Sequence, residues 1–294
     1  MASQYRRAVL RALLTTLRPA QWIKNILVFA APLAAGRLDE WAVFLRTCSA
    51  FVAFCLAASA VYCINDTLDY TFDAQHARKK HRPVASGALP RRVAVTTGIV
   101  LALASLGVCV NWQLRGVIVT YLAINLAYGL GLKRVAVVEY CIVASGFLLR
   151  AVAGGVAANL PLSQWFLIVA GFGSLFMVTG KRLSELVEQG DQAVASRPIL
   201  ARYSISYLRM VTVFAAAITT TAYSLWAFEV AAPKSGFPWA TLSIAPLVMA
   251  LLRYALDVDA GRAQEPEQIV TRDRAIQLLG FCWLVVFVIG VHYG

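Results

Sequence analysis

Four polar side chains follow one another at the end of a long apolar run: Asn65, Asp66, Asp69 and Asp73. If the run continues as a helix at about 100° per residue, all four lie within about 100° of one face. Three carboxylates so close together repel one another and raise each other's pKa. A divalent cation among them removes that cost, and Mg²⁺ prefers hard oxygen ligands and is usually shared with substrate phosphates. The spacing therefore predicts a Mg²⁺ site for a diphosphate substrate, with the three aspartates as its catalytic ligands and Asn65 assisting, rather than a solvated acidic loop.

Basic residues follow this segment directly, in the run Arg78-Lys79-Lys80-His81-Arg82. Beside a metal-carboxylate site, cations of this kind would neutralise phosphate oxygens that the metal ion does not reach, and Arg can do so with two parallel bonds. Lys80 and Arg82 are therefore candidates for phosphate contact. The alternative is a basic cluster that touches lipid headgroups.

A second basic pair, Lys133-Arg134, follows Gly129 and Gly131 near another helix end. Glycines at such a place let the backbone approach a ligand closely. Phosphate contact and topology anchoring are both compatible with this pair. Lys24, in the N-terminal part of the chain, is a further candidate for phosphate contact.

A third cluster contains Lys181, Arg182, Glu185 and Glu188, which share one face of a helix at the same angular spacing. This mixture suits an anionic group, although a self-satisfied cluster of ion pairs would have the same pattern.

Glu139 opens another apolar run and is a further candidate for substrate binding, and Arg150 lies in the same run, eleven residues beyond it. This places Arg150 about 16 Å deep in a helix. An ionisable side chain at that depth is costly and indicates function by default. Arg150 could hold a lipid phosphate, or it could pair with a polar group between helices.

The elements that position these residues are predicted to cross a membrane. Hydrophobic residues make up 60% of the 294 residues and charged residues 14%, against about 25% charged residues in soluble domains. A span needs about 20 mainly apolar residues, and in lipid each span must be helical. The sequence therefore predicts an all-α integral membrane protein with about nine transmembrane helices in one polytopic domain, residues 1–294. The expected spans are 22–36, 43–64, 92–112, 115–131, 136–157, 163–180, 207–229, 237–254 and 274–293.

The distribution of charge predicts the topology. With the N-terminus inside, only Arg37, Arg46, Arg115 and Lys234 of the 27 Lys and Arg residues fall outside, and Arg150 lies within a span. Cytoplasmic loops of membrane proteins carry such an excess of basic residues. We therefore expect an inner (plasma) membrane protein whose N-terminus and active site are cytoplasmic and whose C-terminus is outside. The expected inner parts are a basic N-terminal segment, 1–20, and the loops 65–91, 132–136, 181–206 and 255–273.

The net charge of +12 does not indicate nucleic-acid binding, because the charges form short clusters between apolar runs and no basic stretch has interleaved aromatic residues. The six cysteines contain no C-x-x-C pair and are expected to be small buried hydrophobic residues. A homo-oligomer is compatible with the sequence, which does not determine the oligomeric state.

The motif Asn65-Asp66-x-x-Asp69-x-x-x-Asp73, followed by Arg82-Pro83 and Ser86-Gly87, resembles the UbiA superfamily of intramembrane prenyltransferases. The resemblance implies nine transmembrane helices around a central cavity that opens to the cytoplasmic face, and Mg²⁺ as cofactor. One motif departs from the pattern. The aromatic prenyltransferases of the superfamily carry a second Asp-x-x-x-Asp motif after helix six, whereas this chain has Lys181-Arg182-x-x-Glu185. A more basic site of this kind suits a monophosphate anion.

Three stretches are similar to a branch of the superfamily that acts on phosphoribose: Arg18-Pro-Ala-Gln-Trp-Ile-Lys24-Asn25, the run from Gly173 to Arg182, and Leu252-Arg-Tyr-Ala-Leu-Asp257-Val-Asp259. This resemblance implies transfer of 5-phosphoribosyl from 5-phosphoribosyl 1-diphosphate to a polyprenyl (decaprenyl) phosphate, for cell-wall arabinan synthesis. The lipid phosphate would be bound by Lys181, Arg182 and Arg150, and it would attack the ribose at C1. An aromatic prenyltransferase with a prenyl diphosphate donor is the nearer alternative, and a membrane transporter is the more distant one.

Overall fold

The computed structural model describes residues 2–75, 79–230, 237–265, 269 and 272–293, and the side chains of these residues except 2–6, 230 and 293. The described residues are helical or irregular and contain no strand. They form two compact units. Unit 1 comprises Met1–Ala30, Glu40–Lys133 and Leu149–Leu160, and unit 2 comprises Ala31–Asp39, Arg134–Leu148 and Pro161–Gly294. The all-α fold class is confirmed.

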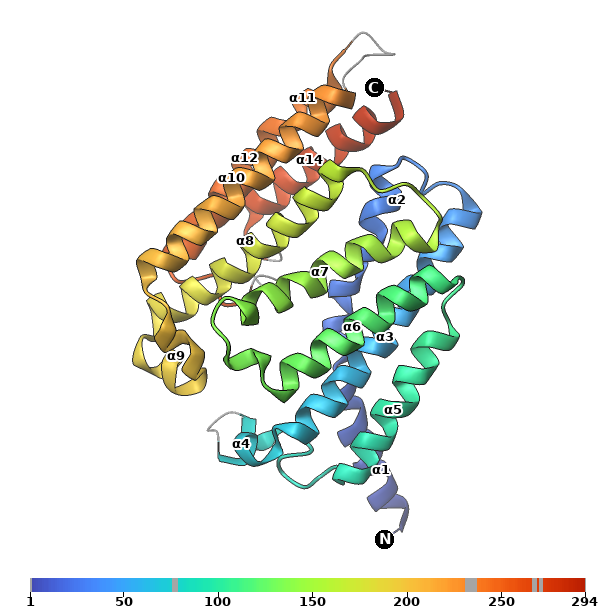
Figure 1. The fold of residues 1–294 in the computed structure, drawn as a ribbon, viewed down its shortest axis with the longest axis vertical. Helices are drawn as coiled ribbons and strands as arrows, with labels where there is room; N and C mark the ends of the chain where they lie inside the picture. Colours follow the sequence, from blue (N-terminus) through green and yellow to red (C-terminus); the bar gives the residue numbers. More distant parts are fainter. Residues whose placement is uncertain (1, 76–78, 231–236, 266–268, 270–271, 294) are drawn as a thin grey trace. The chain divides into compact units, whose positions relative to one another are not determined.

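Unit 1 contains the helices around the aspartate motif (Figure 1). In chain order they are α1 (Ala2–Leu17), η1 (Pro19–Phe29), α3 (Trp41–Leu68), α4 (Tyr70–Gln75), η2 (Lys79–His81), α5 (Arg91–Gly107), α6 (Trp112–Leu130) and the last part of α7 (Val138–Ala157). The short η3 (Leu132–Arg134) follows α6.

Small residues on α3 allow its neighbours in unit 1 to approach closely. Ala50, Ala53 and Ala57 are fully buried in the core of the unit. A Cβ atom added at Gly98 of α5 would lie 3.0 Å from the Ile64 side chain and 3.3 Å from the Ala60 carbonyl oxygen. Such small-residue contacts are typical of helices packed in membranes, where backbone approach replaces the hydrophobic effect. They make α3 the central helix of the unit.

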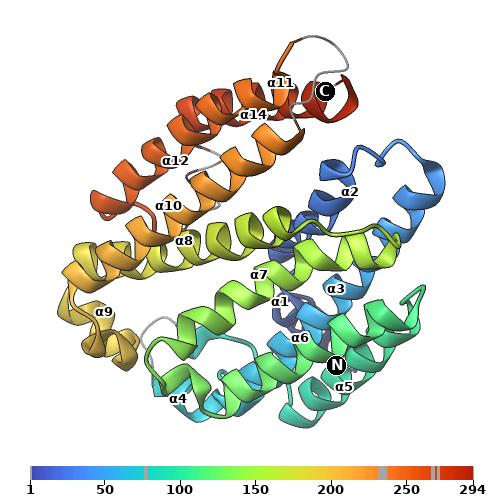
Figure 2. The same ribbon diagram turned by 45° about the horizontal axis from the view of Figure 1, so that its top comes forward.

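Unit 2 contains most of α2 (Ala30–Ala34) and the first part of α7, followed by the C-terminal helices. These are α8 (Gln164–Gln189), α9 (Asp191–Ser196), η4 (Pro198–Arg202), α10 (Ile205–Val230), α11 (Trp239–Leu242), α12 (Ile244–Asp259) and α14 (Arg274–Tyr293). Helices α8 and α10 run side by side, as do α12 and α14 (Figure 2). Phe176, Leu183 and Leu208 are among the largest buried side chains of this unit.

Eight of the nine expected spans coincide with helices, although α8 extends well beyond its expected end to Gln189 and the span 237–254 is divided between α11 and α12. The region 22–36 is the exception, because it forms the 3₁₀ helix η1 and the short α2. Arg18 has a left-handed backbone (φ 52°) and Pro19 begins η1, while Pro32 lies in α2. Proline lacks the N–H that a continuous helix needs, and this is one reason for the irregular start.

Six helical segments of the described chain are long and apolar enough to cross a membrane: α3, α7, α8, α10, α11–α12 and α14. Helix α5, with 17 residues, is only about 25 Å long, against a hydrocarbon core of about 30 Å. The six long apolar helices confirm a multi-pass membrane protein. The count of nine spans stays a prediction.

The expected inner loops are more helical than predicted. Helix α8 continues beyond the expected end at residue 180 to Gln189, and α9 and η4 follow it. Its extension is amphipathic, since Leu183 is buried whereas Glu188 is exposed, and Gly190 with φ 49° ends it. Helix α12 likewise extends to Asp259.

Candidate active site

The aspartate segment bends at Asp69. Helix α3 ends at Leu68, Asp69 has φ −94° and ψ 4°, and α4 begins at Tyr70. The expectation that Asn65, Asp66, Asp69 and Asp73 share one face of a continuous helix is therefore wrong, although two of the carboxylates still meet.

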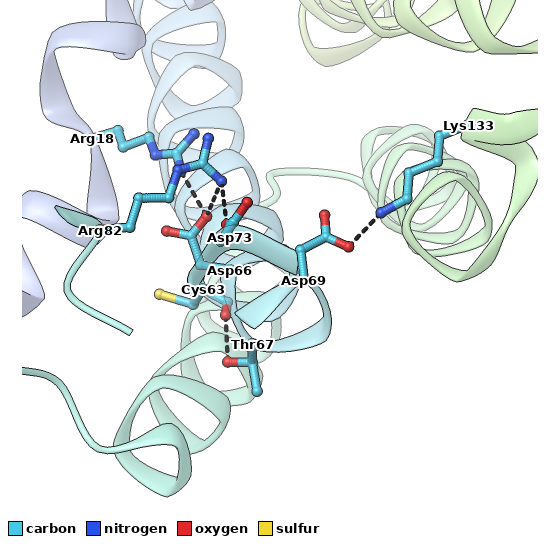
Figure 3. A network of polar contacts seen from close by, with 8 residues as sticks. All are labelled: Arg18, Cys63, Asp66, Thr67, Asp69, Asp73, Arg82 and Lys133. Carbon is cyan, nitrogen blue, oxygen red and sulfur yellow. Dashed lines mark hydrogen bonds and ion pairs between the residues drawn. The ribbon is translucent and has the colours of Figure 1, made fainter. Parts of the chain in front are cut away.

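Asp66 and Asp73 meet at the guanidinium group of Arg82 (Figure 3). One nitrogen of Arg82, Nη1, donates to Asp66 Oδ1 at 3.2 Å and to Asp73 Oδ2 at 2.7 Å. The two aspartate side chains are only 3% and 4% exposed, whereas that of Arg82 is 31% exposed. The predicted proximity of Arg82 to the aspartates is thus present, with direct contact between them.

Asp69 points the other way, toward Lys133 (Figure 3). Its Oδ1 accepts a hydrogen bond from the ammonium group of Lys133, which follows α6 in η3. Both side chains are partly exposed. The two residues are 64 positions apart in the chain, and the structure brings together the first acidic motif and the second basic pair, which the sequence suggested separately.

The donor chemistry of this cluster fits Mg²⁺, because carboxylate and amide oxygens are the ligands it prefers. In the part of the chain that the structure describes, however, no three His, Cys, Asp or Glu side chains converge on one point. Asp66 and Asp73 converge on Arg82 Nη1, and Asp69 is bound to Lys133. Each carboxylate thus faces a protein cation.

Asn65 lies against α6, where Gly129 allows the close approach. A Cβ atom added at Gly129 would lie 2.6 Å from Asn65 Oδ1 and 3.3 Å from a methyl carbon of Leu68. Contacts under 3.0 Å essentially do not occur for real Cβ atoms. The sequence indicated close backbone approach near Gly129, and in the structure the neighbour is Asn65.

Arg18 is a site residue that the sequence analysis did not include among its candidates. Its Nη2 donates to Asp66 Oδ1 at 2.6 Å, and its guanidinium carbon lies 4.6 Å from the centre of the Tyr62 ring. The adjoining chain is held on α3, since Ser59 donates to the Leu17 carbonyl oxygen and accepts from Trp22. Arg18 and Asp66 are 48 positions apart, and the Arg-Pro pair at the start of the N-terminal stretch was the only available signal.

The third cluster lies in unit 2 and is a buried network of ion pairs. Arg182 binds Glu139 with Nε at 3.1 Å and with Nη2 at 3.0 Å, and Nη1 lies 3.4 Å from Glu185 Oε2. Glu139 is fully buried and Arg182 is 3% exposed. Arg197 adds a contact of 3.6 Å to Glu185. This arrangement corresponds to the self-satisfied alternative considered for Arg182 and Glu185, with Glu139 as an added partner.

Tyr203, which directly follows η4, contacts the chain next to this network. Its hydroxyl oxygen accepts a hydrogen bond of 2.8 Å from the backbone N–H of Val137, which has φ 68°. Burial raises the pKa of Tyr203, so the hydroxyl stays neutral. Its ring stacks on that of Tyr207. These contacts fix the chain just before Glu139.

Arg150 is bound by polar and aromatic groups inside unit 1. Its Nε donates to Asn25 Oδ1 at 2.7 Å and its Nη2 to the Tyr121 hydroxyl at 3.0 Å. The guanidinium carbon also lies 4.9 Å from the Tyr121 ring centre and 5.4 Å from that of Phe54. The predicted polar partner between helices is therefore present. Arg150 links η1, α3, α6 and α7.

The remaining candidates differ in exposure. Lys24 and Lys181 are half-buried, whereas Lys80 and Arg134 are exposed. Lys80 lies in η2, and Arg134 ends η3.

Comparison with known proteins agrees with this architecture. The sequence profile of the UbiA prenyltransferase family matches residues 26–289. The chain is 46% identical to the decaprenyl-phosphate phosphoribosyltransferase of Mycobacterium tuberculosis over 95% of this chain and 93% of that protein. It is 40% identical to the Corynebacterium glutamicum protein of the same name over 95% of this chain and 86% of that protein.

Among solved structures, a UbiA homologue from Archaeoglobus fulgidus bound to DMAPP and Mg²⁺ is similar with a TM-score of 0.72 at 14% identity. The match covers 95% of this chain and 98% of that chain, and it shows a common fold. The protein is therefore a multi-pass membrane enzyme. The chain belongs to the UbiA prenyltransferase family.

Proposed function

We propose that this enzyme transfers the 5-phosphoribosyl group of 5-phosphoribosyl 1-diphosphate to a polyprenyl phosphate such as decaprenyl phosphate, with release of diphosphate. The observation that carries the proposal is the 46% identity to a decaprenyl-phosphate phosphoribosyltransferase over almost the full length of both chains. By analogy with the mycobacterial relatives, the product would be a precursor of cell-wall arabinan.

The aspartate site of unit 1 supports binding of the donor's diphosphate. Asp66, Asp69 and Asp73, with Asn65, would hold Mg²⁺, which when bound neutralises the charge of the leaving diphosphate. Arg18, Arg82 and Lys133 border the carboxylates. These cations can bind phosphate oxygens that the metal ion does not reach, and Lys24, Lys80 and Arg134 are further candidates.

The lipid phosphate would be the nucleophile. One of its oxygens forms a bond to C1 of the ribose while the bond from C1 to the diphosphate oxygen breaks, and the bonding pair leaves with the diphosphate. The attacking oxygen is already anionic at neutral pH, so the step needs no strong general base. In-line attack would invert the configuration at C1.

In unit 2, Lys181 is the candidate that we retain for the lipid phosphate. Arg182 is bound to Glu139 and Glu185, so we assign it a positioning role at the ends of α7 and α8. Arg150, bound to Asn25 and Tyr121, has a corresponding role in unit 1. Glu139 and Glu185 then position Arg182 rather than contact substrate.

No feature favours the alternatives. An aromatic prenyltransferase would be expected to carry a second Asp-x-x-x-Asp motif, and this chain has Lys181-Arg182-x-x-Glu185 at that place in α8. A transporter is not supported by the mycobacterial and corynebacterial relatives described above, which are named as transferases.

The proposal is tested by incubating the purified protein with 5-phosphoribosyl 1-diphosphate and decaprenyl phosphate, and separately with a prenyl diphosphate and an aromatic acceptor. We expect release of diphosphate from 5-phosphoribosyl 1-diphosphate and not from a prenyl diphosphate. The opposite pattern would show that the lipid is the donor.

We also propose a cytoplasmic N-terminus and aspartate site in the plasma membrane, with the C-terminus outside.

A further inference from the structure

We propose that protein cations already neutralise the aspartate site before substrate binds, so that Mg²⁺ and diphosphate bind cooperatively and each alone binds weakly. This inference rests on the proposed function, because it takes the aspartates as the Mg²⁺ ligands. It concerns the order in which charges exchange partners at that site.

The charges of the described cluster are balanced. Three carboxylates each contact a basic side chain: Asp66 contacts Arg18 and Arg82, Asp73 contacts Arg82, and Asp69 contacts Lys133 (Figure 3). Arg82 Nη1 lies between the two buried carboxylates, at the point where a cation shared by Asp66 and Asp73 would lie. A metal ion that binds there must displace this nitrogen.

The burial of the partners shows which of them can move. The side chains of Asp66 and Asp73 are 3% and 4% exposed, while those of Arg18 and Arg82 are 28% and 31% exposed. The guanidinium groups can therefore turn toward solvent or a ligand, whereas the carboxylates are fixed by packing. Removing the partner of a buried charge is strongly destabilising, so the arginines keep the aspartates in place until another cation arrives.

The electrostatics then favour joint binding. Mg²⁺ alone would displace Arg82 from the carboxylates yet remain close to its positive charge, and like charges at short range repel. Diphosphate alone would approach carboxylates that repel it. When both ligands are present, the carboxylates would hold Mg²⁺ and the freed guanidinium groups would donate to the phosphate oxygens. Arg forms strong charge-assisted hydrogen bonds with phosphate. Each ligand thereby removes the cost of the other.

Binding of Mn²⁺, a spectroscopically visible substitute for Mg²⁺, tests the proposal without turnover. The full-length protein in detergent is titrated with Mn²⁺, with and without inorganic diphosphate, and free Mn²⁺ is followed by electron paramagnetic resonance. Binding of Mn²⁺ by diphosphate itself is measured without protein and subtracted. We expect diphosphate to raise the affinity of the protein for Mn²⁺ about tenfold or more. Equal affinity with and without diphosphate would overturn the proposal.

The variant Arg82→Gln identifies the competing cation. Without the guanidinium group, Mn²⁺ alone should bind about fivefold more tightly, while the enhancement by diphosphate should shrink. Weaker binding of Mn²⁺ alone in this variant would overturn the proposal, provided that the variant keeps the elution profile of the wild-type protein.

Arg91→Gln is the matched control, because Arg91 lies in the same unit with its guanidinium group 3.9 Å from the Tyr70 ring centre. It also removes one positive charge, and we expect binding as in the wild-type protein. An equal effect of both variants would show that net charge, rather than the contact with the aspartates, controls binding, and would overturn the proposal.

The outcome is distinguishable from failure of the proposed function. Cooperative binding of Mn²⁺ and diphosphate without phosphoribosyl transfer would support the inference and refute the proposed donor. Transfer of phosphoribose together with independent binding of the two ligands would refute the inference alone.

Discussion

Asp69 differs from the two aspartates beside it in sequence, because it is partly exposed and bound to Lys133 instead of being buried at Arg82. Its carboxylate can therefore be removed with little effect on folding. The variant Asp69→Asn keeps the shape of the side chain and removes its charge. We expect phosphoribosyl transfer to fall about 100-fold or more, by analogy with the loss of other preorganised electrostatic groups.

The elution profile and the thermal unfolding midpoint of Asp69→Asn should match those of the wild-type protein. Asp39→Asn is the control, since Asp39 is an exposed aspartate before α3, and it should keep full activity. Full transfer in Asp69→Asn would remove this residue from the metal site.

Glu139 and Arg182 form a buried ion pair. The losses of unfolding free energy caused by removing the two partners should therefore not be additive. Glu139→Ala leaves a buried guanidinium group with an incomplete set of partners, and we expect a loss of about 3–5 kcal/mol in the free energy of unfolding. The double variant Glu139→Ala, Arg182→Ala removes both charges and should lose less than the sum of the losses of its two single variants, Glu139→Ala and Arg182→Ala. Unfolding in mixed micelles with SDS measures all four proteins. Additivity within about 0.5 kcal/mol would contradict a coupled pair.

Helices α3 and α6 approach each other closely where Asn65, the amide proposed for the metal site, faces Gly129. Gly129→Ala would place a Cβ atom 2.6 Å from Asn65 Oδ1, so that Asn65 or the helix must shift. We expect transfer at limiting Mg²⁺ to fall about tenfold, the effect of losing roughly 1.4 kcal/mol of interaction. Gly116→Ala in the same helix is the control, because its Cβ atom meets nothing within 4 Å. It should be neutral or stabilise the helix by up to about 1 kcal/mol. Equal rates for the two variants would contradict this account.

The helices were largely predictable because each requires an unbroken apolar run, which is visible in one sequence. The bend at Asp69 was not predictable, because no Gly or Pro marks it in the sequence. In the structure, the backbone N–H of Asp69 still donates to the Asn65 carbonyl oxygen. Arg18 and Glu139 were harder still, because their partners lie 48 and 43 positions away. Such pairings are decided by tertiary packing. The spacing of the aspartates predicts a metal site, and the folded chain determines which cation each aspartate contacts.

The distribution of charge along the whole chain predicts that the two termini lie on opposite sides of the membrane. A fluorescent protein that matures only in the cytoplasm should be bright at the N-terminus and dark at the C-terminus. Alkaline phosphatase, which is active only outside, should give the reverse pattern. Bright fluorescence at both termini would require an even number of spans, and it would contradict the predicted nine.

In the proposed reaction, a soluble diphosphate donates phosphoribose to a lipid phosphate with the help of Mg²⁺. The most direct measurement follows radiolabelled 5-phosphoribosyl 1-diphosphate in the presence of decaprenyl phosphate and purified protein. We expect label to enter the organic-soluble lipid with Mg²⁺, and to stay in the aqueous phase with EDTA or with Asp69→Asn. Lipid that remains unlabelled with Mg²⁺ present would refute the proposed transfer.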